Sequence, residues 1–492
     1  MFLAMMRSCA VLCVIVFING CATGGMSKSI DSSTIHGAYS LLAPDKKGET
    51  IIYARIVVDG HSTQCPDLID ESGTVLPTSP RAFHPDSAGS NHFPITVCEA
   101  IIASETRYQD NSGAVTLSPV TLDPKNIQVY GDSGCKAKNC QPGTAAKQFE
   151  DLIKYGATLS PELILHMGDY NYRGTSGSIK NGIYTQDIYA YDAGDGGYGG
   201  KTCGLDEVYY SQNAIGSDSP DNWQNWYDDF FLPTKQLLSK APWVFARGNH
   251  ELCSRAGPGW FYFFGPGSSL PGATTQLQCP EQGTLASPPS QAIDHIQMIP
   301  AYFVKLKHLQ LWVMDSANAC DAGASNALTA QYQTWFDELQ SDIGKQNTWM
   351  VTHRPTWGVD RSGDKETLMN TMLQVALDNT KEKRLPAPVT LSFSGHMHIF
   401  QTLSFDETSK RPPQLIVGNS GVSMENITDG TFSTTIDGEM VKGNELKKHG
   451  FLQINYHHDG SWKGNLLNKS GNDLAKCGSK QLQQVQTVCI LQ

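Results

Sequence analysis

Basic residues are scarce in this sequence of 492 residues. Lysine and arginine together number 37 against 48 aspartates and glutamates, which gives a formal net charge of -11. Proteins that coat nucleic acids depend on clustered basic side chains, so we expect no nucleic-acid-binding surface. Internal repeats and coiled-coil heptads are also lacking, which excludes solenoid and fibrous architectures. Any anionic substrate must therefore be attracted by the local charge of a site.

No two of the 13 cysteines have the CxxC spacing. This spacing is typical of thiolate zinc sites, so its absence argues against such a site. Three cysteines lie in, or directly after, an apolar segment near the N-terminus, and the other ten are an even number, as expected for disulfides in an oxidising compartment. Cys135 with Cys140 and Cys477 with Cys489 are close enough for local loops. The other pairings stay open.

The apolar segment from Cys9 to Ile18 is too short to span a bilayer. It follows a single cation, Arg7, and ends in Asn19-Gly20-Cys21, which resembles a bacterial lipobox. We therefore predict that residues 1–21 are a signal peptide with a lipobox, and that a lipid on Cys21 attaches an exported protein to the membrane. Ala22 in place of aspartate indicates, by the same resemblance, the outer membrane. The alternative is an ordinary cleaved secretion signal.

Residues 22–125 have the pattern of a small β-rich domain. Ile51–Val58 and Ile95–Cys98 are predicted strands, and the residues between them are rich in proline, glycine and aspartate. A structural or docking role fits this region better than a catalytic one.

Residues 126–492 alternate between strand and helix patterns, as expected for an α/β layered domain. Two long inserts, at about 174–221 and 253–299, are rich in glycine, proline, serine and asparagine. Loops of this length in a compact domain are usually functional or mobile. The predicted strands are Ile127–Tyr130, Leu163–His166, Trp243–Ala246, an Ala301–Val313 hairpin, Thr348–Val351, Val389–Phe393, Gln414–Val417, Phe451–Tyr456 and Trp462–Leu467, and the predicted helices are Ala145–Tyr155, Trp223–Leu238, Leu328–Ile343 and Glu366–Leu377.

Five short polar blocks each follow a predicted buried strand, where a layered sheet has its ligand-binding edge. A string such as Gly-Asn-His-Glu arises by chance in on the order of one chain in a few hundred, so five in order are not accidental. Together they supply oxygen and nitrogen ligands without sulfur, a set that suits iron, zinc or manganese. The blocks are Gly131-Asp132-Ser133-Gly134, Gly168-Asp169-Tyr170-Asn171-Tyr172, Gly248-Asn249-His250-Glu251, Val351-Thr352-His353-Arg354-Pro355 and Gly395-His396-Met397-His398.

These blocks resemble the signature of the calcineurin-like metallophosphoesterases, and specifically of the purple acid phosphatases, over about Asn126 to Phe400. The resemblance implies a four-layer α/β/β/α sandwich after the β-rich domain. Most of the superfamily has Asp-x-His in the first block, whereas this chain has Asp132-Ser133-Gly134. Tyr172 stands where purple acid phosphatases supply a phenolate instead. The missing histidine and its replacement therefore occur together.

The resemblance also implies the ligands of two metal ions. The first ion would be held by Asp132, Tyr172 and His398, the second by Asn249, His353 and His396, and Asp169 would bridge them. A phenolate favours a trivalent ion, so we expect Fe(III) in the first position and divalent iron, zinc or manganese in the second.

The activity implied is hydrolysis of phosphate monoesters by attack of a metal-bound hydroxide, with His250 and Asp169 as the catalytic residues. His250 would bind the phosphate or protonate the departing alkoxide, and its alternative is an orienting role. Arg247, Arg354 and Glu251 flank ligands and are either partners of the ligands or ordinary loop ion pairs. Two other functions stay open: a phosphodiesterase or nucleotidase, and a surface binding protein with a vestigial phosphoesterase domain.

Overall fold

The computed structural model describes residues 34–61, 64–86, 91–135, 140, 143–144, 146–173, 221–253, 255–267, 270, 277–279, 297–321, 326–363, 366–406, 409, 411–479 and 488–492. The predicted signal peptide with Cys21 lies outside the described residues. So does most of each of the two predicted inserts.

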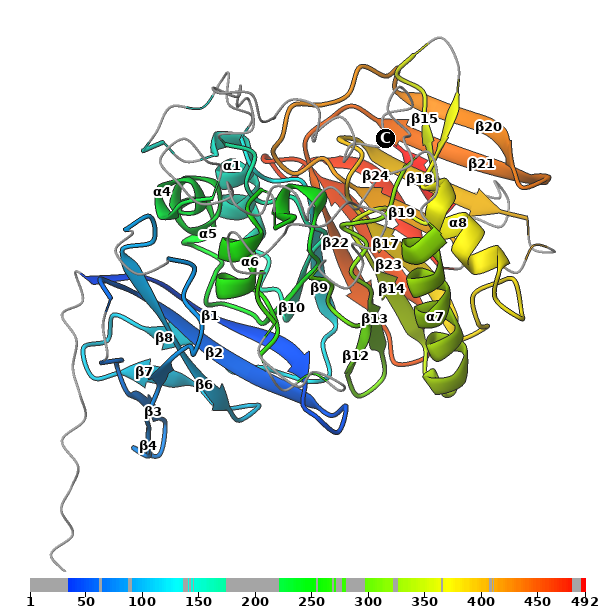
Figure 1. Ribbon diagram of the computed structural model, residues 1–492. Helices are drawn as coiled ribbons and strands as arrows, with labels where there is room; N and C mark the ends of the chain where they lie inside the picture. The colour runs from blue at the N-terminus through cyan, green and yellow to red at the C-terminus, as the bar shows by residue number, and fades with distance from the viewer. Residues whose placement is uncertain are drawn as a thin grey trace, which may run out of the picture.

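Two large sheets form the centre of the molecule (Figure 1). The first has eleven strands, in the order β25 (Cys489–Leu491), β24 (Asp473–Gly478), β23 (Trp462–Leu467), β22 (Phe451–Tyr456), β9 (Asn126–Tyr130), β10 (Leu163–His166), β11 (Trp243–Phe245), β1 (Ile35–Pro44), β2 (Thr50–Asp59), β6 (Ile95–Ile102) and β5 (Ser79–Pro80). The second has eight, in the order β12 (Tyr302–Lys305), β13 (Gln310–Val313), β14 (Thr348–Val351), β17 (Val389–Ser394), β19 (Gln414–Val417), β18 (Phe400–Phe405), β21 (Glu439–Leu446) and β20 (Gly430–Ile436).

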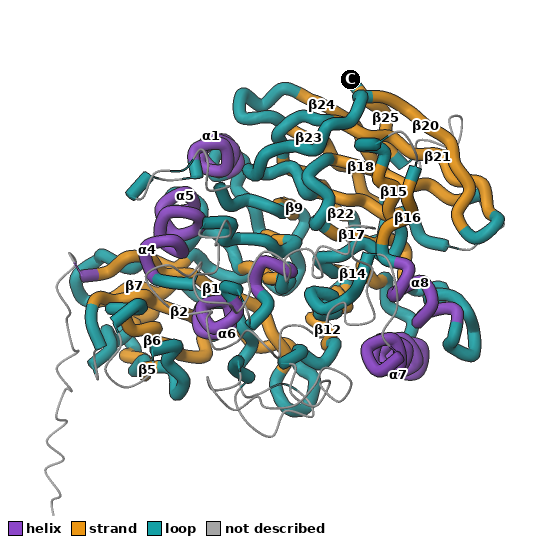
Figure 2. The backbone as a smooth tube through the Cα atoms, turned by 45° about the horizontal axis from the view of Figure 1, so that its top comes forward, coloured by secondary structure: helices purple, strands orange, loops and turns teal. Residues whose placement is uncertain are grey.

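Helices flank the two sheets on opposite sides, as Figure 2 shows. On the side of the first sheet are α1 (Lys147–Gly156), α4 (Trp223–Trp226), α5 (Leu232–Thr234) and α6 (Gly257–Phe263). The π-helical turn η4 (Tyr227–Phe231) joins α4 to α5, and the 3-10 turn η5 (Asn249–Glu251) follows β11. On the side of the second are α7 (Asn326–Asp342) and α8 (Thr371–Asp378). Within the described residues, no helix has the length and apolar character needed to cross a membrane.

The two sheets share one core. Leu165 of β10 and Val351 of β14 belong to the same cluster of buried side chains, and the ring of Trp349 lies 5.4 Å from Phe393 and 6.4 Å from Trp462 of the first sheet. A second cluster lies between the second sheet and helices α7 and α8. Strands covered on both faces are rich in consecutive apolar residues, as in Leu163–His166 of β10 and Thr348–Val351 of β14. The predicted α/β sandwich is confirmed.

The N-terminal region consists of strands, as its sequence indicates. Strand β1 pairs with β11 in parallel at Leu41 and Trp243, so β1, β2, β6 and β5 continue the first sheet. A separate four-stranded sheet contains β4 (Val75–Leu76), β3 (Leu68–Asp70), β7 (Tyr108–Asp110) and β8 (Thr116–Leu117). The domain boundary at residue 125 stays a prediction. The pairing of β1 with β11 joins strands from the two sides of this boundary in one sheet.

The predicted helix Glu366–Leu377 is wrong over its first turn. Residues Thr367–Met369 form strand β16, which pairs with β15 (Gly358–Asp360), and α8 begins only at Thr371. Asn370 separates them with a φ of 60°, a left-handed conformation that asparagine tolerates better than most residues. This turn ends the strand and starts the helix.

Four disulfides join described residues. Cys135–Cys140 and Cys477–Cys489 confirm the two predicted local pairs, and Cys65–Cys98 and Cys253–Cys279 are further links. Cys320 is also disulfide-bonded.

Candidate metal centre

The five polar blocks lie at the carboxyl ends of five buried strands. Strands β9, β10 and β11 are parallel neighbours in the first sheet, and β14 and β17 are parallel neighbours in the second. The two edges meet, because His353 Nδ1 after β14 lies 2.7 Å from the carbonyl oxygen of Met167 after β10. All the predicted ligands therefore converge between the two sheets.

Three of the predicted ligands have a left-handed backbone. The φ angles of Asp132, Asp169 and His396 are 55°, 56° and 73°, values that residues with a side chain rarely adopt. Such strain gathers at functional sites, where the surrounding structure maintains it. At Gly248 a side chain is excluded altogether, since a Cβ there would lie 2.1 Å from Asp169 Oδ1.

Tyr172 is the centre of the first cluster. Its phenol oxygen lies 3.0 Å from Asp132 Oδ1, 3.0 Å from Asp169 Oδ2 and 3.2 Å from His398 Nε2. Tyr172 and Asp132 are fully buried. A phenol has one hydrogen to donate, so it satisfies only one of the two carboxylates at a time. A cation among the four groups would bind all of them, and the donor set fits the predicted first metal ion.

Asn249 is the centre of the second cluster. Its Oδ1 lies 2.9 Å from His353 Nε2 and 2.9 Å from His396 Nδ1. Each histidine uses its other ring nitrogen elsewhere: His353 Nδ1 donates to Met167, and His396 Nε2 donates to Asp321 Oδ2 at 2.7 Å. The nitrogens that face Asn249 therefore carry lone pairs. Three acceptors directed at one another are the arrangement that a cation stabilises.

Asp169 belongs to both clusters. Its carboxylate lies within 4.8 Å of the ring nitrogens of His353 and His396 in one group, and within 4.8 Å of potential ligand atoms of Asp132 and His398 in the other. Oδ2 faces Tyr172, whereas Oδ1 lies 3.3 Å from His353 Nε2. Each oxygen thus points to a different cluster, which is the geometry predicted for a bridging ligand.

The charges of the centre are unbalanced without a cation. Burial, with the charge of Asp169 second, raises the pKa of Asp132 well above its usual value, and burial with two carboxylates does the same to the pKa of Tyr172. Burial also raises the pKa of Asp169, but the neighbouring imidazole of His353 and the ring and backbone N–H of His250 outweigh it and hold that pKa well below normal. A bound cation would favour the charged forms of all three acids.

His250 lies beside both clusters without belonging to either. Its backbone N–H donates to Asp169 Oδ1 at 2.9 Å, and its ring centroid is 4.1 Å from that of Tyr172. Its side chain is partly exposed, unlike Tyr172 and Asp169. This is the position expected of a group that faces a bound substrate.

Glu251 is a support of the centre whose role the sequence left undecided. Its buried carboxylate accepts the backbone N–H groups of Asp169, Tyr170 and Asn171 at 3.0, 2.8 and 3.2 Å. Burial, followed by the charge of Asp169, raises the pKa of Glu251 to about 8. It is therefore a clamp on the strained loop that carries Asp169, not a loop ion pair.

Three further supports were not predicted. Asp229 accepts the backbone N–H of Tyr172 at 3.3 Å, and Ser316 Oγ accepts those of His353 and Arg354 at 3.0 and 2.8 Å. The third is Asp321, the partner of His396. In the sequence, the only signal for Asp229 is a charged pair inside an otherwise aromatic stretch, Tyr227–Phe231. The support roles of these three residues can be recognised only from their contacts in the folded chain.

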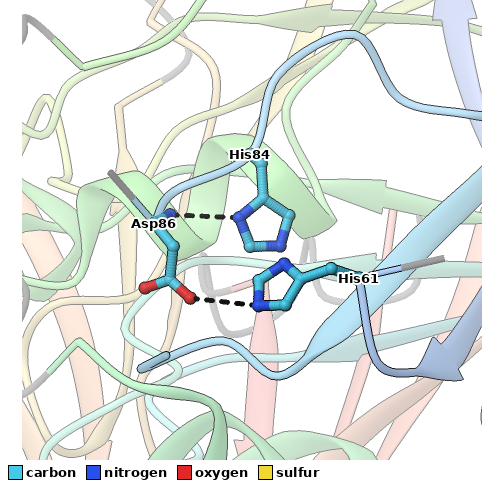
Figure 3. Close-up of side chains that lie close together, drawn as sticks. All are labelled: His61, His84 and Asp86. Atoms are coloured by element: carbon cyan, nitrogen blue, oxygen red, sulfur yellow. Dashed lines mark hydrogen bonds and ion pairs between the residues drawn. The ribbon is translucent and has the colours of Figure 1, made fainter. Parts of the chain in front are cut away.

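Other groups of potential metal ligands lie outside the five blocks. Figure 3 shows His61, His84 and Asp86, but the Nδ1 of His84 accepts the backbone N–H of Asp86 at 3.1 Å and its Nε2 lies 3.0 Å from the carbonyl oxygen of Ile95. Because both ring nitrogens form hydrogen bonds, His84 stabilises its own loop, and its lone pair is not available to a metal ion. Another such group combines Asp123, His308 and His458.

The sequence pattern of the calcineurin-like phosphoesterases matches residues 127–400, more than half of the chain and the whole span of the five blocks. The chain belongs to this family. It is a metal-dependent phosphoester hydrolase, and the family implies two metal ions, for which the two clusters are the candidate sites. No curated protein matches the sequence.

Several solved structures are similar to this member of the family. A purple acid phosphatase from yellow lupin (Lupinus luteus) seeds has 13% identity and a TM-score of 0.49, with 88% of this chain and 72% of that chain covered. PhoD has 10% identity and a TM-score of 0.46, covering 94% and 93%. A dimetal phosphatase from Danio rerio has 11% identity and a TM-score of 0.34, covering 73% and 99%.

Proposed function

We propose that this phosphoesterase hydrolyses phosphate monoesters in the manner of a purple acid phosphatase. Asp132, Tyr172 and His398 would hold Fe(III), Asn249, His353 and His396 would hold a divalent iron, zinc or manganese ion, and Asp169 would lie between the two ions. The observation that carries the proposal is the phenol oxygen of Tyr172, which contacts Asp132, Asp169 and His398 at once.

The space around Gly134 supports the proposal that Tyr172 replaces a histidine ligand at position 134. A Cβ at Gly134 would lie 2.8 Å from the Tyr172 ring, 2.3 Å from the carbonyl oxygen of Tyr170 and 2.9 Å from Asp229 Oδ2. A histidine at position 134 and a tyrosine at position 172 would therefore compete for one volume. The phenol ring fills the space that the ordinary superfamily ligand would need.

Two metal ions, when bound, would acidify water and clamp the phosphoryl oxygens of the ester. The chain supplies the rest of the chemistry. Glu251 accepts the backbone N–H of Asp169 and so holds this loop in its strained form, and buried surroundings strengthen every charge interaction at the site. The partly exposed His250, whose ring centroid lies 4.1 Å from that of Tyr172, would bind the phosphate or protonate the leaving alkoxide.

The ester class can be tested with two chromogenic substrates. We expect p-nitrophenyl phosphate to be hydrolysed with a higher kcat/KM than bis-p-nitrophenyl phosphate, because a dianionic monoester gains more from two cations than a monoanionic diester does. The measurement is steady-state kinetics of both esters with one metal-loaded preparation. A preference for the bis-ester would favour the phosphodiesterase alternative, and no hydrolysis of a phosphoester panel by protein with two bound ions would favour a vestigial domain.

Export and lipid attachment are a second proposal, carried by the sequence before Cys21 and supported by four disulfides in the described residues. We expect Cys21→Ser protein, expressed in a Gram-negative bacterium, to move from the membrane fraction to the soluble or unprocessed fraction. Fractionation with immunoblotting measures the change. A membrane fraction equal to that of the unaltered chain would contradict the lipid anchor.

A further inference from the structure

Asp321 and Arg354 form a buried ion pair against one predicted ligand of the second metal ion. Asp321 Oδ2 lies 2.7 Å from Arg354 Nη1 and 2.7 Å from His396 Nε2. Arg354 Nη1 also lies 3.0 Å from His396 Nε2, but a carboxylate oxygen only accepts, so the shorter contact assigns the hydrogen of Nε2 to the bond with Asp321. The Asp321 side chain is 2% exposed and that of Arg354 is fully buried. One carboxylate oxygen thus accepts from a guanidinium and from an imidazole at the same time.

Both partners are fixed by the folded chain. The carbonyl oxygen of Asp321 accepts the backbone N–H of Thr371, the first residue of α8, at 3.1 Å, and Arg354 Nε lies 3.4 Å from the carbonyl oxygen of Ala317. The ring of His396 itself belongs to a residue with a strained, left-handed backbone. An ion pair anchored on a helix and on a buried block can therefore set the orientation of this ring.

We propose that Asp321 and Arg354 are positioning residues that hold His396 with Nε2 protonated and with Nδ1 facing the second metal ion. A carboxylate on the far nitrogen fixes the tautomer and the ring orientation of a ligating histidine. Arg354 donates to the same carboxylate oxygen at 2.7 Å, so the buried carboxylate is paired and fixed in place beside the imidazole. The inference rests on the proposed two-ion site, and it concerns only the second ion.

The first ion should be independent of this pair. His396 contributes no side-chain atom to the first cluster, where Tyr172 contacts Asp132, Asp169 and His398. The backbone N–H of His396 does donate to Asp132 at 2.9 Å, but a substitution at Asp321 leaves that bond in place. Substitution of Asp321 is therefore expected to weaken the binding of the second ion and to leave the binding of the first ion unchanged.

The experiment compares Asp321→Ala with the unaltered full chain by equilibrium dialysis against buffered Zn²⁺, with metal content measured by mass spectrometry. We expect the affinity for the second ion to fall about 10- to 100-fold, while one ion per chain is retained. Asp321→Asn, which keeps an oxygen acceptor, should lose less. Thermal unfolding of each variant confirms that it is folded.

The matched control is Asp315→Ala. Asp315 forms another buried ion pair, with Arg247 at 3.1 Å, and its carboxylate also accepts the backbone N–H groups of Ile299 and Ala317. The Asp315→Ala protein should be less stable than the unaltered chain but should still bind the second ion. Unchanged affinity in Asp321→Ala, or an equal loss in Asp315→Ala, would overturn the inference.

If Asp321→Ala does not fold, Asp321→Asn decides, and second-ion affinity equal to that of the unaltered chain would overturn the inference. An unaltered chain that binds two ions and hydrolyses no monoester would refute the proposed activity without affecting this test.

Discussion

Asp169→Ala is expected to lower the turnover of a phosphoester by at least about 1,000-fold. Loss of a single group that stabilises charge in a transition state costs about 100- to 1,000-fold, and Asp169 belongs to both ligand clusters. The same change should reduce the bound metal below two ions per chain. Steady-state kinetics and metal analysis of one preparation measure both effects.

A buried carboxylate away from the centre provides the control for Asp169. Asp110 is 2% exposed and accepts backbone N–H groups in the turn between β7 and β8. Asp110→Ala should lose stability and keep both metal and turnover. If Asp169→Ala retained full turnover, the metal centre would not be part of the catalytic mechanism.

Tyr172→Phe is expected to abolish the visible absorption band of the metal-loaded protein. The substitution retains a ring that packs 4.1 Å from His250 and removes only the oxygen that contacts Asp132, Asp169 and His398. A tyrosinate bound to Fe(III) absorbs in the visible range, so the band and the first-site ion should be lost together. The measurement is a visible spectrum with iron analysis.

Tyr170→Phe is the matched control for Tyr172. Tyr170 is fully buried two residues away, and its hydroxyl donates to the carbonyl oxygen of Ala246 at 2.8 Å, outside both clusters. Its loss should leave the colour unchanged. A colourless unaltered protein that carries iron, or an undiminished band in Tyr172→Phe, would contradict the phenolate ligand.

Much of the catalytic sandwich was predictable because its central strands are buried on both faces. The predicted boundaries of Leu163–His166 and Thr348–Val351 match β10 and β14, since a continuous apolar run between polar turns has few alternative readings. The edge strands were harder. Strand β20, at the edge of the second sheet, mixes buried and exposed residues, and β16 is a three-residue strand within a helical pattern.

The candidate ligands were also legible, because each follows directly after a strand. The residues that support these ligands could not be predicted from the sequence. Asp229 and Asp321 are ordinary aspartates in the sequence, and their roles arise from contacts with Tyr172 and His396 across 57 and 75 residues. No local pattern records a contact over such a separation.

The sequence by itself determined which residues are offered to the metals, since parallel buried strands end at a common edge and the blocks follow those ends. Only the tertiary structure decided which nitrogen of His353 and of His396 faces inward, because hydrogen bonds to Met167 and Asp321 engage the other. It also decided that position 134 has no room for a side chain, because a Cβ there would collide with the carbonyl oxygen of Tyr170 and the ring of Tyr172. Tautomer and steric exclusion depend on atoms brought together from distant segments, and such contacts exist only in the folded chain.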